Sequence, residues 1–210
     1  MVDLDEQDIA GTQPASLATS LEGKFLVAMP TLKGPFFERS VVYLCSHSDD
    51  GAMGLVVNQI STQITFPDLL RQVDILSDDD QSINLPAPAR NMQVLNGGPV
   101  DQGRGFVLHS ADFKLESSTL DVSDDICLTA TIEILRALAE GKGPQSALLT
   151  LGYAGWSPGQ LEEELQSNSW LTCSADQSLL FECEAEDRYQ RSLDLMGIDL
   201  TMLSSEAGHA

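Results

Sequence analysis

The sequence predicts an α+β fold with a mixed or antiparallel sheet. Short strand-like apolar runs outnumber the helix-like amphipathic segments. Two neighbouring runs, 40–47 and 52–58, are joined by a turn that contains Asp50-Gly51, which is a strong signal for a β-hairpin. Because a hairpin pairs its strands antiparallel, these observations argue against a doubly wound parallel fold.

Apolar runs rich in β-branched and aromatic residues predict the strands. The first run, FLVAM, ends at Pro30, and ALLTL at 147–151 has the continuous apolar character of a central strand. The predicted strands are 25–29, 40–47, 52–58, one within 92–100, 104–110, one or two within 118–129, 147–151 and 179–183. The acidic, proline-rich segment 77–90 predicts an exposed loop.

Four segments have the pattern of helices. They start at about Pro67 in TFPDLLRQVDIL, at TIEILRALAEGKGP, and at the segments 157–166 and 187–196. The second helix is expected to bury one face, which carries Ile132, Leu135, Leu138 and Ala139. Thr131 can cap its start, and Gly141 ends it.

The length predicts one domain. A chain of 210 residues is long enough to bury a sizeable core. Residues 1–20 are polar and are expected to form a flexible arm before a single domain at 21–210. The 77–90 loop is the natural seam, but the apolar runs on either side of it are too short for separate cores.

Acidic residues dominate the charge of the chain. There are 11 Lys and Arg against 32 Asp and Glu, a formal net charge of -21. Nucleic-acid binding draws most of its affinity from basic side chains at phosphates, so direct binding of DNA or RNA is not expected. Anionic membrane surfaces are disfavoured for the same reason. A solvated acidic surface explains the charge without a partner, while cationic partners stay open.

The four cysteines carry no metal or redox pattern. None forms a C-x-x-C pair, so neither a zinc ribbon nor a redox dithiol is expected. Cys45 and Cys127 lie in apolar runs and are expected to be buried. The N-terminus lacks the regions of a signal peptide, and no apolar run approaches the ~20 residues that span a bilayer. We therefore expect a cytoplasmic protein.

The stretch GYAGWSPGQLEEEL at 152–165 raises the question of a phosphate-binding loop. Its glycine spacing is neither the dinucleotide fingerprint nor a P-loop, and no lysine or arginine stands near it. Ser157 and Gln160 instead form an S-x-x-Q capping box, which uses the free N–H groups of the helix itself. A strand-to-helix corner is favoured over a ligand loop, and Tyr153 and Trp156 either close the core or line a shallow pocket.

Two histidines, His47 and His109, end predicted strands. If those strands pair, the imidazoles could meet at one end of the sheet and bind a metal with Asp49, Asp50 or Asp112. The chain has no H-x-x-x-H or H-E-x-x-H spacing, and a strand-end histidine is usually a half-exposed rim residue. No metal site is therefore assigned.

The sequence also contains the residue types of a hydrolase triad. It would combine Ser40 or Ser110 with His47 or His109 and an aspartate. Triads are recognised by geometry, and the G-x-S-x-G elbow is absent from the sequence. The pattern therefore assigns no catalytic residue.

The segment NGGPVDQGRG at 96–105 combines turn residues with a rare cation. Proline fixes φ and glycine takes positive φ, so Asn96 to Pro99 have the chemistry of a turn. Arg104 is structural if it is buried near a carboxylate. If it faces a cleft instead, it is the natural anchor of an anionic ligand.

Several segments together resemble the AlgH/YqgE family of bacterial proteins, which also occurs in plants. They are FLVAMPTLKGPFFERSVVYLCSHSDDGAMGLVVNQ (25–59), VLNGGPVDQGRGFVLHS (94–110), LGYAGWSPGQLEEELQSNSWL (151–171) and LMGIDLTMLSSEAGHA (195–210). The resemblance covers nearly everything after the N-terminal arm. It implies an α+β fold with a mixed, largely antiparallel, branched and partly barrel-like sheet surrounded by helices.

The resemblance brings no established catalytic residues and no cofactor. The family's motifs fall here on Pro35, Phe37, Ser40, His47, Gly51, Asn58, Gly97, Gly98, Pro99, Arg104, Gly105, His109, Tyr153, Gly155, Trp156, Gly159 and Gln160. The candidate ligand-binding residues are Ser40, His47, Asn58, Gly97, Gly98, Arg104, His109, Tyr153 and Trp156. The chain has Gly34, Ser46 and Gln59-Ile60 where the family commonly has Asp, Glu and Lys-Pro. These departures put a carboxylate–histidine pair at 46–47 in doubt.

Family members are often labelled transcriptional regulators because of a genetic link to alginate production. The favoured hypothesis is a non-enzymatic cytoplasmic factor that binds a protein or small-molecule ligand and affects transcription indirectly. The alternative is an unrecognised hydrolase-like enzyme with a cleft formed by the loops 34–40, 97–109 and 153–160. We expect a monomer or weak dimer.

Overall fold

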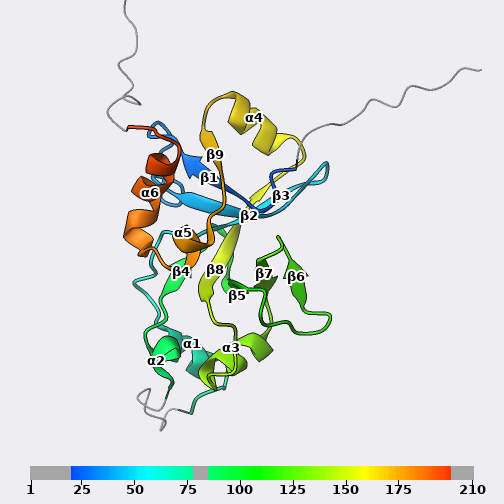
Figure 1. The fold of residues 1–210 in the computed structure, drawn as a ribbon, viewed down its shortest axis with the longest axis vertical. Helices are drawn as coiled ribbons and strands as arrows, with labels where there is room; N and C mark the ends of the chain where they lie inside the picture. Colours follow the sequence, from blue (N-terminus) through cyan, green and yellow to red (C-terminus); the bar gives the residue numbers. More distant parts are fainter. Residues whose placement is uncertain (1–19, 78–84, 200–210) are drawn as a thin grey trace, which may run out of the picture.

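A nine-stranded sheet forms the centre of the protein (Figure 1). The computed structural model describes residues 20–77 and 85–199. The strands are β1 (Lys24–Ala28), β2 (Val41–Ser48), β3 (Gly51–Val56), β4 (Val94–Asn96), β5 (Val100–Ser110), β6 (Thr119–Asp121), β7 (Ile126–Thr129), β8 (Ala147–Trp156) and β9 (Trp170–Ser174). The expected arm at 1–20, apart from Ser20, and the family's C-terminal motif from residue 200 onward lie outside the described residues.

The sheet branches at β8. The strands follow the order β6-β7-β5-β8-β3-β2-β1-β9, and β4 pairs with β8 beside this path. The first half of β8 pairs in parallel with β4 and antiparallel with β5, whereas its second half pairs antiparallel with β3. The sheet therefore curls into a half-barrel around β8. The predicted α+β fold, with a mixed, largely antiparallel, branched and partly barrel-like sheet surrounded by helices, is confirmed.

Helices cover the sheet at three places (Figure 1). They are α1 (Phe66–Gln72), α2 (Ala87–Arg90), α3 (Ile132–Ala139), α4 (Gln160–Gln166), α5 (Gln177–Phe181), the 3-10 turn η2 (Ala185–Asp187) and α6 (Arg188–Leu195). Helices α1, α2 and α3 gather at one end of the molecule, α4 lies at the other, and α5 and α6 lie beside β1 and β2. No helix among the described residues is long and apolar enough to cross a membrane.

The strands β1 and β2 separate two of the three apolar clusters. Phe25 and Tyr43 pack with α5 and α6 on one face, while Leu26 and Leu44 pack with α4 on the other. Alternate residues of a strand point to opposite faces, which explains why both strands read as continuous apolar runs. A third cluster joins α1, α2 and α3 to β4, β5 and β8. The predicted burial of Cys45 and Cys127 is confirmed, since neither is exposed at all.

The strand expected at 147–151 continues to Trp156, so the prediction of a corner starting at 152 is wrong. Gly152 has φ 73° in mid-strand, and a Cβ placed there would lie 2.7 Å from Gly98 O. Glycine at position 152 therefore allows β8 to pair first with β5 and then with β3 while it remains one continuous strand. The sequence pattern predicted the end of the strand before Gly152 because glycine usually interrupts a strand.

Helix α4 starts later than its capping pattern predicts. Its N-cap is Gly159 with φ 77°, not Ser157, and the helix runs from Gln160. Half of the expected capping box is present, because Gln160 Oε1 accepts the Ser157 N–H at 3.0 Å. The Ser157 side chain does not cap the helix. A turn at 158–159 separates the two halves of the motif.

The expected strand at 179–183 is wrong, because most of it belongs to helix α5. Asp176 accepts the N–H of Ser178 at 2.9 Å and so starts the helix. A short apolar run does not by itself distinguish a strand from a buried helix, and the capping aspartate decided the outcome. The true strand nearby is β9, which begins at Trp170 and pairs antiparallel with β1.

Helices α2 and α3 also differ from prediction. In α3, Ile132 is 46% exposed and Ile134 is fully buried, so the apolar face is rotated from the expected one. Thr131 is the N-cap residue but makes no side-chain capping bond. The segment expected as a loop at 77–90 contains helix α2, whose Ala89 is buried. Its residues 78–84 lie outside the described part of the chain.

Candidate functional site

His47 is held by two hydrogen bonds at the end of β2. Its Nδ1 accepts the Leu21 N–H at 3.1 Å, and its Nε2 lies 2.7 Å from Glu162 Oε1 on α4. The ring is almost fully buried, with 7% of the side chain exposed. The pKa of Glu162 is lowered, first by a backbone N–H of the same residue and then by His47. Both ring nitrogens are occupied, so the ring as it stands has no free nitrogen for a ligand.

His109 is buried in a directed chain of hydrogen bonds. Leu115 N–H donates to Thr119 Oγ1, which lies 2.8 Å from Thr129 Oγ1, which in turn lies 2.9 Å from His109 Nε2. His109 Nδ1 donates to Ser110 O at 3.0 Å, so Nε2 is the acceptor that ends the chain. Burial lowers the pKa of His109, which favours this neutral form. His109 therefore stabilises the packing of β5 against β7.

The two histidines do not meet, so that prediction is wrong. His109 pairs with Ala147 at the start of β8, while His47 pairs with Ala52, which pairs with Trp156 at the end of β8. The two histidines therefore lie beside opposite ends of this ten-residue strand. Within the described residues no group of three or more His, Cys, Asp or Glu could hold a metal ion.

Ser40 and Ser110, the serines considered for a hydrolase triad, make no hydrogen bond to a histidine ring among the described residues. Ser40 is buried and its hydroxyl donates to Phe37 O at 3.0 Å. The Ser110 hydroxyl donates to Asp112 in a short hydrogen bond and accepts the Ser146 N–H. The pKa of Asp112 is lowered, chiefly by this Ser110 bond. Neither serine is hydrogen-bonded to a histidine ring among the described residues, so the structure assembles no Ser-His-Asp triad from these residues.

Asn58 fixes the start of β2. Its Oδ1 accepts the Val41 N–H at 2.8 Å, and its Nδ2 donates to Arg39 O at 2.8 Å. Arg39 has φ 54°, an unusual value for a residue other than glycine. Asn58 therefore holds a turn in place, and its amide is used by the protein itself.

Gly97 and Gly98 let two chain segments approach closely. A Cβ at Gly97 would lie 2.2 Å from Gly152 O, and a Cβ at Gly98 would lie 2.2 Å from the Tyr153 carbonyl carbon. These positions admit only glycine because backbone of β8 fills the space. The glycines of the motif therefore pack against β8 and form no phosphate cradle.

Tyr153 and Trp156 point to different environments. Trp156 is 6% exposed and donates from Nε1 to Glu164 Oε2 at 2.9 Å, so it belongs to the core beside α4. Tyr153 packs edge-to-face on Phe106, and the guanidinium of the exposed Arg104 lies 5.2 Å from the Phe106 ring. Arg104 makes no ion pair with a described residue. His109, by contrast, is fully buried and lies against Thr129.

A pocket of about 260 Å³ lies beside the Gly98 turn. We call it the amide pocket. Its lining residues are Phe36, Ser61, Gln63, Ile64, Gln72, Asn96, Gly98, Gln102 and Leu151. None of these nine residues is ionisable in the physiological range, although the chain is rich in carboxylates. The amide side chains of Gln63, Gln72 and Asn96 make no hydrogen bond to a described residue, so they are available to a ligand.

Sequence reasoning found one edge of the amide pocket and missed the rest. Gly98 was a candidate, but the glutamines come from α1 and from the segment before it. These residues are 26 to 35 positions from Gly98 in the chain, and backbone pairing such as that of Ile60 with Leu95 brings the segments together. No local spacing could have signalled the amide pocket.

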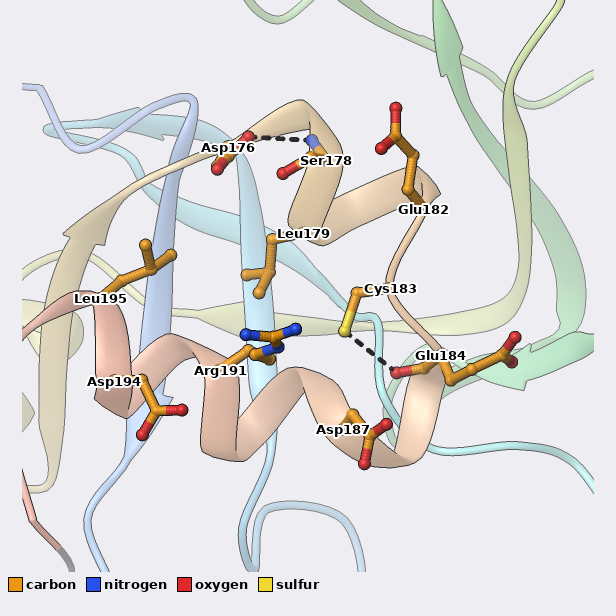
Figure 2. Close-up of a pocket in the computed structure, with 10 residues that line it drawn as sticks. All are labelled: Asp176, Ser178, Leu179, Glu182, Cys183, Glu184, Asp187, Arg191, Asp194 and Leu195. Atoms are coloured by element: carbon orange, nitrogen blue, oxygen red, sulfur yellow. Dashed lines mark hydrogen bonds between the residues drawn. The ribbon is translucent and has the colours of Figure 1, made fainter.

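The α5–α6 groove is strongly acidic (Figure 2). It measures about 610 Å³ and is lined by Asp176, Ser178, Leu179, Glu182, Cys183, Glu184, Asp187, Arg191, Asp194 and Leu195. Figure 2 shows Leu179 and Arg191 near its centre, with the carboxylates of Glu182 and Glu184 turned outward. Burial is the main cause that raises the pKa of Cys183, so its thiol is not an activated nucleophile.

The fold and the described site define an α+β half-barrel protein with a neutral pocket and an acidic groove on its surface. The chain belongs to the AlgH-like family, whose sequence model matches residues 25–201. The resemblance found in the motifs is thereby confirmed.

Relatives and solved structures agree with this assignment. The chain is 55% identical over 200 residues to the UPF0301 protein blr1492 of Bradyrhizobium diazoefficiens, covering 95% of this chain and 93% of the relative. It is 57% identical over 190 residues to the UPF0301 protein mlr7511 of Mesorhizobium japonicum, covering 90% and 93%. The solution structure of AlgH from Pseudomonas aeruginosa matches with a TM-score of 0.72 and 39% identity, over 94% of this chain and 100% of that one. The crystal structure of DIP2367 from Corynebacterium diphtheriae shares the fold, with a TM-score of 0.65 and 19% identity over 87% and 91%.

Proposed function

We propose that the protein is a non-enzymatic cytoplasmic factor that binds a small, neutral, polar molecule in the amide pocket and affects transcription only indirectly. The observation that carries the proposal is the chemistry of the lining. Gln63, Gln72 and Asn96 offer amide donors and acceptors that no described residue uses, and Ile64 and Leu151 add apolar surface. Small-molecule sites commonly combine apolar surface with a few convergent polar groups.

The absence of ionisable groups from this lining favours binding over catalysis. General acid–base chemistry needs a titratable side chain within hydrogen-bond reach of the reacting atom. The enzyme alternative required the 34–40, 97–109 and 153–160 loops to bring their polar side chains together. Ser40 and His109 are instead buried in separate hydrogen bonds, and Arg104 lies on the surface. The geometry gives that alternative no support.

The indirect effect on transcription rests on the charge. A net charge of -21 repels the phosphate backbone of nucleic acids. A regulatory role would then pass through a protein partner or through the bound small molecule. A gel-shift assay at low salt with the isolated protein is expected to show no sequence-specific binding. Tight, sequence-specific binding would overturn this part of the proposal.

Native mass spectrometry of the gently purified protein tests the ligand itself. We expect a co-purified neutral molecule, whose identity is then read by fragmentation. The purified molecule should bind the stripped protein, and Gln72→Ala and Gln63→Ala should each weaken it about three- to tenfold, as expected for one lost neutral hydrogen bond. Gln166→Ala, an exposed glutamine on α4, is the matched control. Equal effects at all three positions would contradict the assignment of the amide pocket.

A further inference from the structure

Arg188 is a buried cation at the start of α6. It is 4% exposed, and its carboxylate neighbours lie beyond ion-pair distance among the described residues. Among the described residues its hydrogen bonds go only to backbone oxygens, because Nε donates to Leu179 O at 3.2 Å and Nη1 makes a short bond to Val57 O. Glu184 and Glu186 act on its charge without forming an ion pair in contact with it. A buried charge with no counter-ion in contact is costly, so an anion that contacted Arg188 would be stabilised at this position.

Part of the guanidinium reaches open space. Arginine has five N–H donors, and the two bonds to carbonyls use one each. Nη2 has no hydrogen-bond partner among the described residues, and it is not one of their buried, unpaired side-chain atoms. It is therefore accessible, and Arg188 is one of the residues that line a cleft of about 610 Å³. We call this the Arg188 cleft.

The walls of the Arg188 cleft are part apolar and part polar. Met92 precedes β4, Leu148 lies on β8 and Phe181 ends α5, and prolines from α2 and the 141–146 loop complete the apolar surface. Asn91 and Gln145 add neutral polar groups. Apolar side chains on part of the wall, beside one buried cation, match a ligand that has an apolar portion and one anionic group.

The rim of the cleft restricts the charge of that ligand. Glu182 and Glu184 belong to both the Arg188 cleft and the α5–α6 groove, and they lie on the segment between α5 and η2. Their charges repel anions, and a dianion is repelled more strongly than a monoanion. A phosphate group is therefore disfavoured against a single carboxylate.

We propose that the Arg188 cleft binds a small monocarboxylate with an apolar body, whose carboxylate accepts hydrogen bonds from the free N–H groups of Arg188. The site shares no lining residue with the amide pocket, so the inference does not rest on the proposed function. Such a site would stabilise one specific anion in a chain whose formal net charge is -21.

Hexanoate is the probe for this site, with hexanol and inorganic phosphate as comparisons. Titrations of the full chain followed by NMR are expected to shift the Met92 methyl and Leu148 methyl signals with hexanoate. Hexanol should bind at least tenfold more weakly because it lacks the charge. Equal binding of hexanol, or preferred binding of phosphate, would overturn the proposal, as would no shift at about 10 mM hexanoate, a weak-binding limit.

Variants at the rim test the site without touching the Arg188 hydrogen bonds. Glu184→Gln removes a repulsive charge and should tighten hexanoate binding about two- to fivefold, with the effect reduced at high salt. Arg188→Gln should abolish binding, but it also removes a buried contact and its folding must be checked by circular dichroism. Arg191→Gln, on the same helix but absent from the Arg188 cleft, is the cation control and should leave the affinity within about twofold. Unchanged or weaker binding by Glu184→Gln would count against the site even if Arg188→Gln did not fold.

Discussion

His47 Nε2 lies 2.7 Å from Glu162 Oε1, while its Nδ1 accepts the Leu21 N–H at 3.1 Å. Because Nδ1 is an acceptor here, the ring proton is on Nε2 and is donated to the carboxylate. One imidazole thus links the end of β2 to α4 and to the residues before β1. A histidine that the motif pattern placed among the ligand-binding candidates is, in the structure, a cross-link between three segments.

His47→Ala should destabilise the protein by about 1–3 kcal/mol, because it leaves a part-buried N–H without its acceptor and opens space between β2 and α4. Urea denaturation followed by circular dichroism measures this loss. Glu163→Gln, an exposed neighbour of Glu162 on α4, should change the free energy of unfolding by less than about 0.5 kcal/mol. Equal losses in the two variants would show that His47 is not the cross-link described.

The buried His109 predicts a pH dependence of stability. Burial holds its pKa below the ordinary 6.5, with Ser110 and Asp112 opposing the shift only in part. The unfolded chain therefore takes up a proton first as the pH falls. The free energy of unfolding should decrease as the pH falls through 6.5 and level off below the folded-state pKa. The lowered pKa values of carboxyls such as Glu162 and Asp112 act at lower pH, as the pH falls through their ordinary values of 4.5 and 3.8.

Denaturation at a series of pH values from 8 to 5 measures the slope of the free energy of unfolding against pH. The variant His109→Asn is the comparison. Asparagine keeps a donor for the Ser110 carbonyl and does not titrate. Its slope between pH 7 and pH 5.5 should be smaller than that of the parent protein, whatever its absolute stability. Identical slopes would mean that other groups cause the pH dependence.

The local pattern predicted the sheet better than the helices near its ends. Strands such as β2 and β3 were found because a β-branched run and an Asp50-Gly51 turn are properties of adjacent residues. The strand expected at 179–183 was wrong because a five-residue apolar run fits both structures. The length of β8 was missed because its glycine at 152 is required by the backbone of residue 98, more than fifty positions away.

The candidate site shows the same limit. The glycines at 97 and 98 were noticed, but their reason is contact with β8 and not a ligand. His47 and His109 look equivalent in the sequence, yet the strand register places them at opposite ends of β8. Arg188 carries no motif at all. Its burial depends on packing among α5, α6 and the end of β3, which no spacing in the sequence reveals.

Alanine at Gly97 or Gly98 tests the close approach between the β4 turn and β8. Each added methyl would lie 2.2 Å from backbone atoms that cannot move without breaking strand pairing. Each variant should lose at least about 3 kcal/mol of stability, as expected for a clash with fixed backbone. Gly103→Ala is the matched control, since nothing lies within 4 Å of its added Cβ. Thermal denaturation should leave the melting temperature of Gly103→Ala within about 2 °C of the parent. A similar tolerance at Gly97 and Gly98 would contradict the packing role.

Glu164 accepts the indole N–H of both tryptophans of the chain. Its Oε2 lies 2.9 Å from Trp156 Nε1 and 2.7 Å from Trp170 Nε1, and the two indoles are 6% and 3% exposed. Glu164→Leu leaves two buried donors unpaired and should lower the free energy of unfolding by about 2–4 kcal/mol. Because the chain contains only these two tryptophans, its intrinsic fluorescence reports this contact directly. Glu164→Gln keeps one oxygen acceptor and should lose about half as much. Glu163→Leu is the control on the exposed face of α4, and a loss there equal to that of Glu164→Leu would rule out the shared carboxylate as the cause.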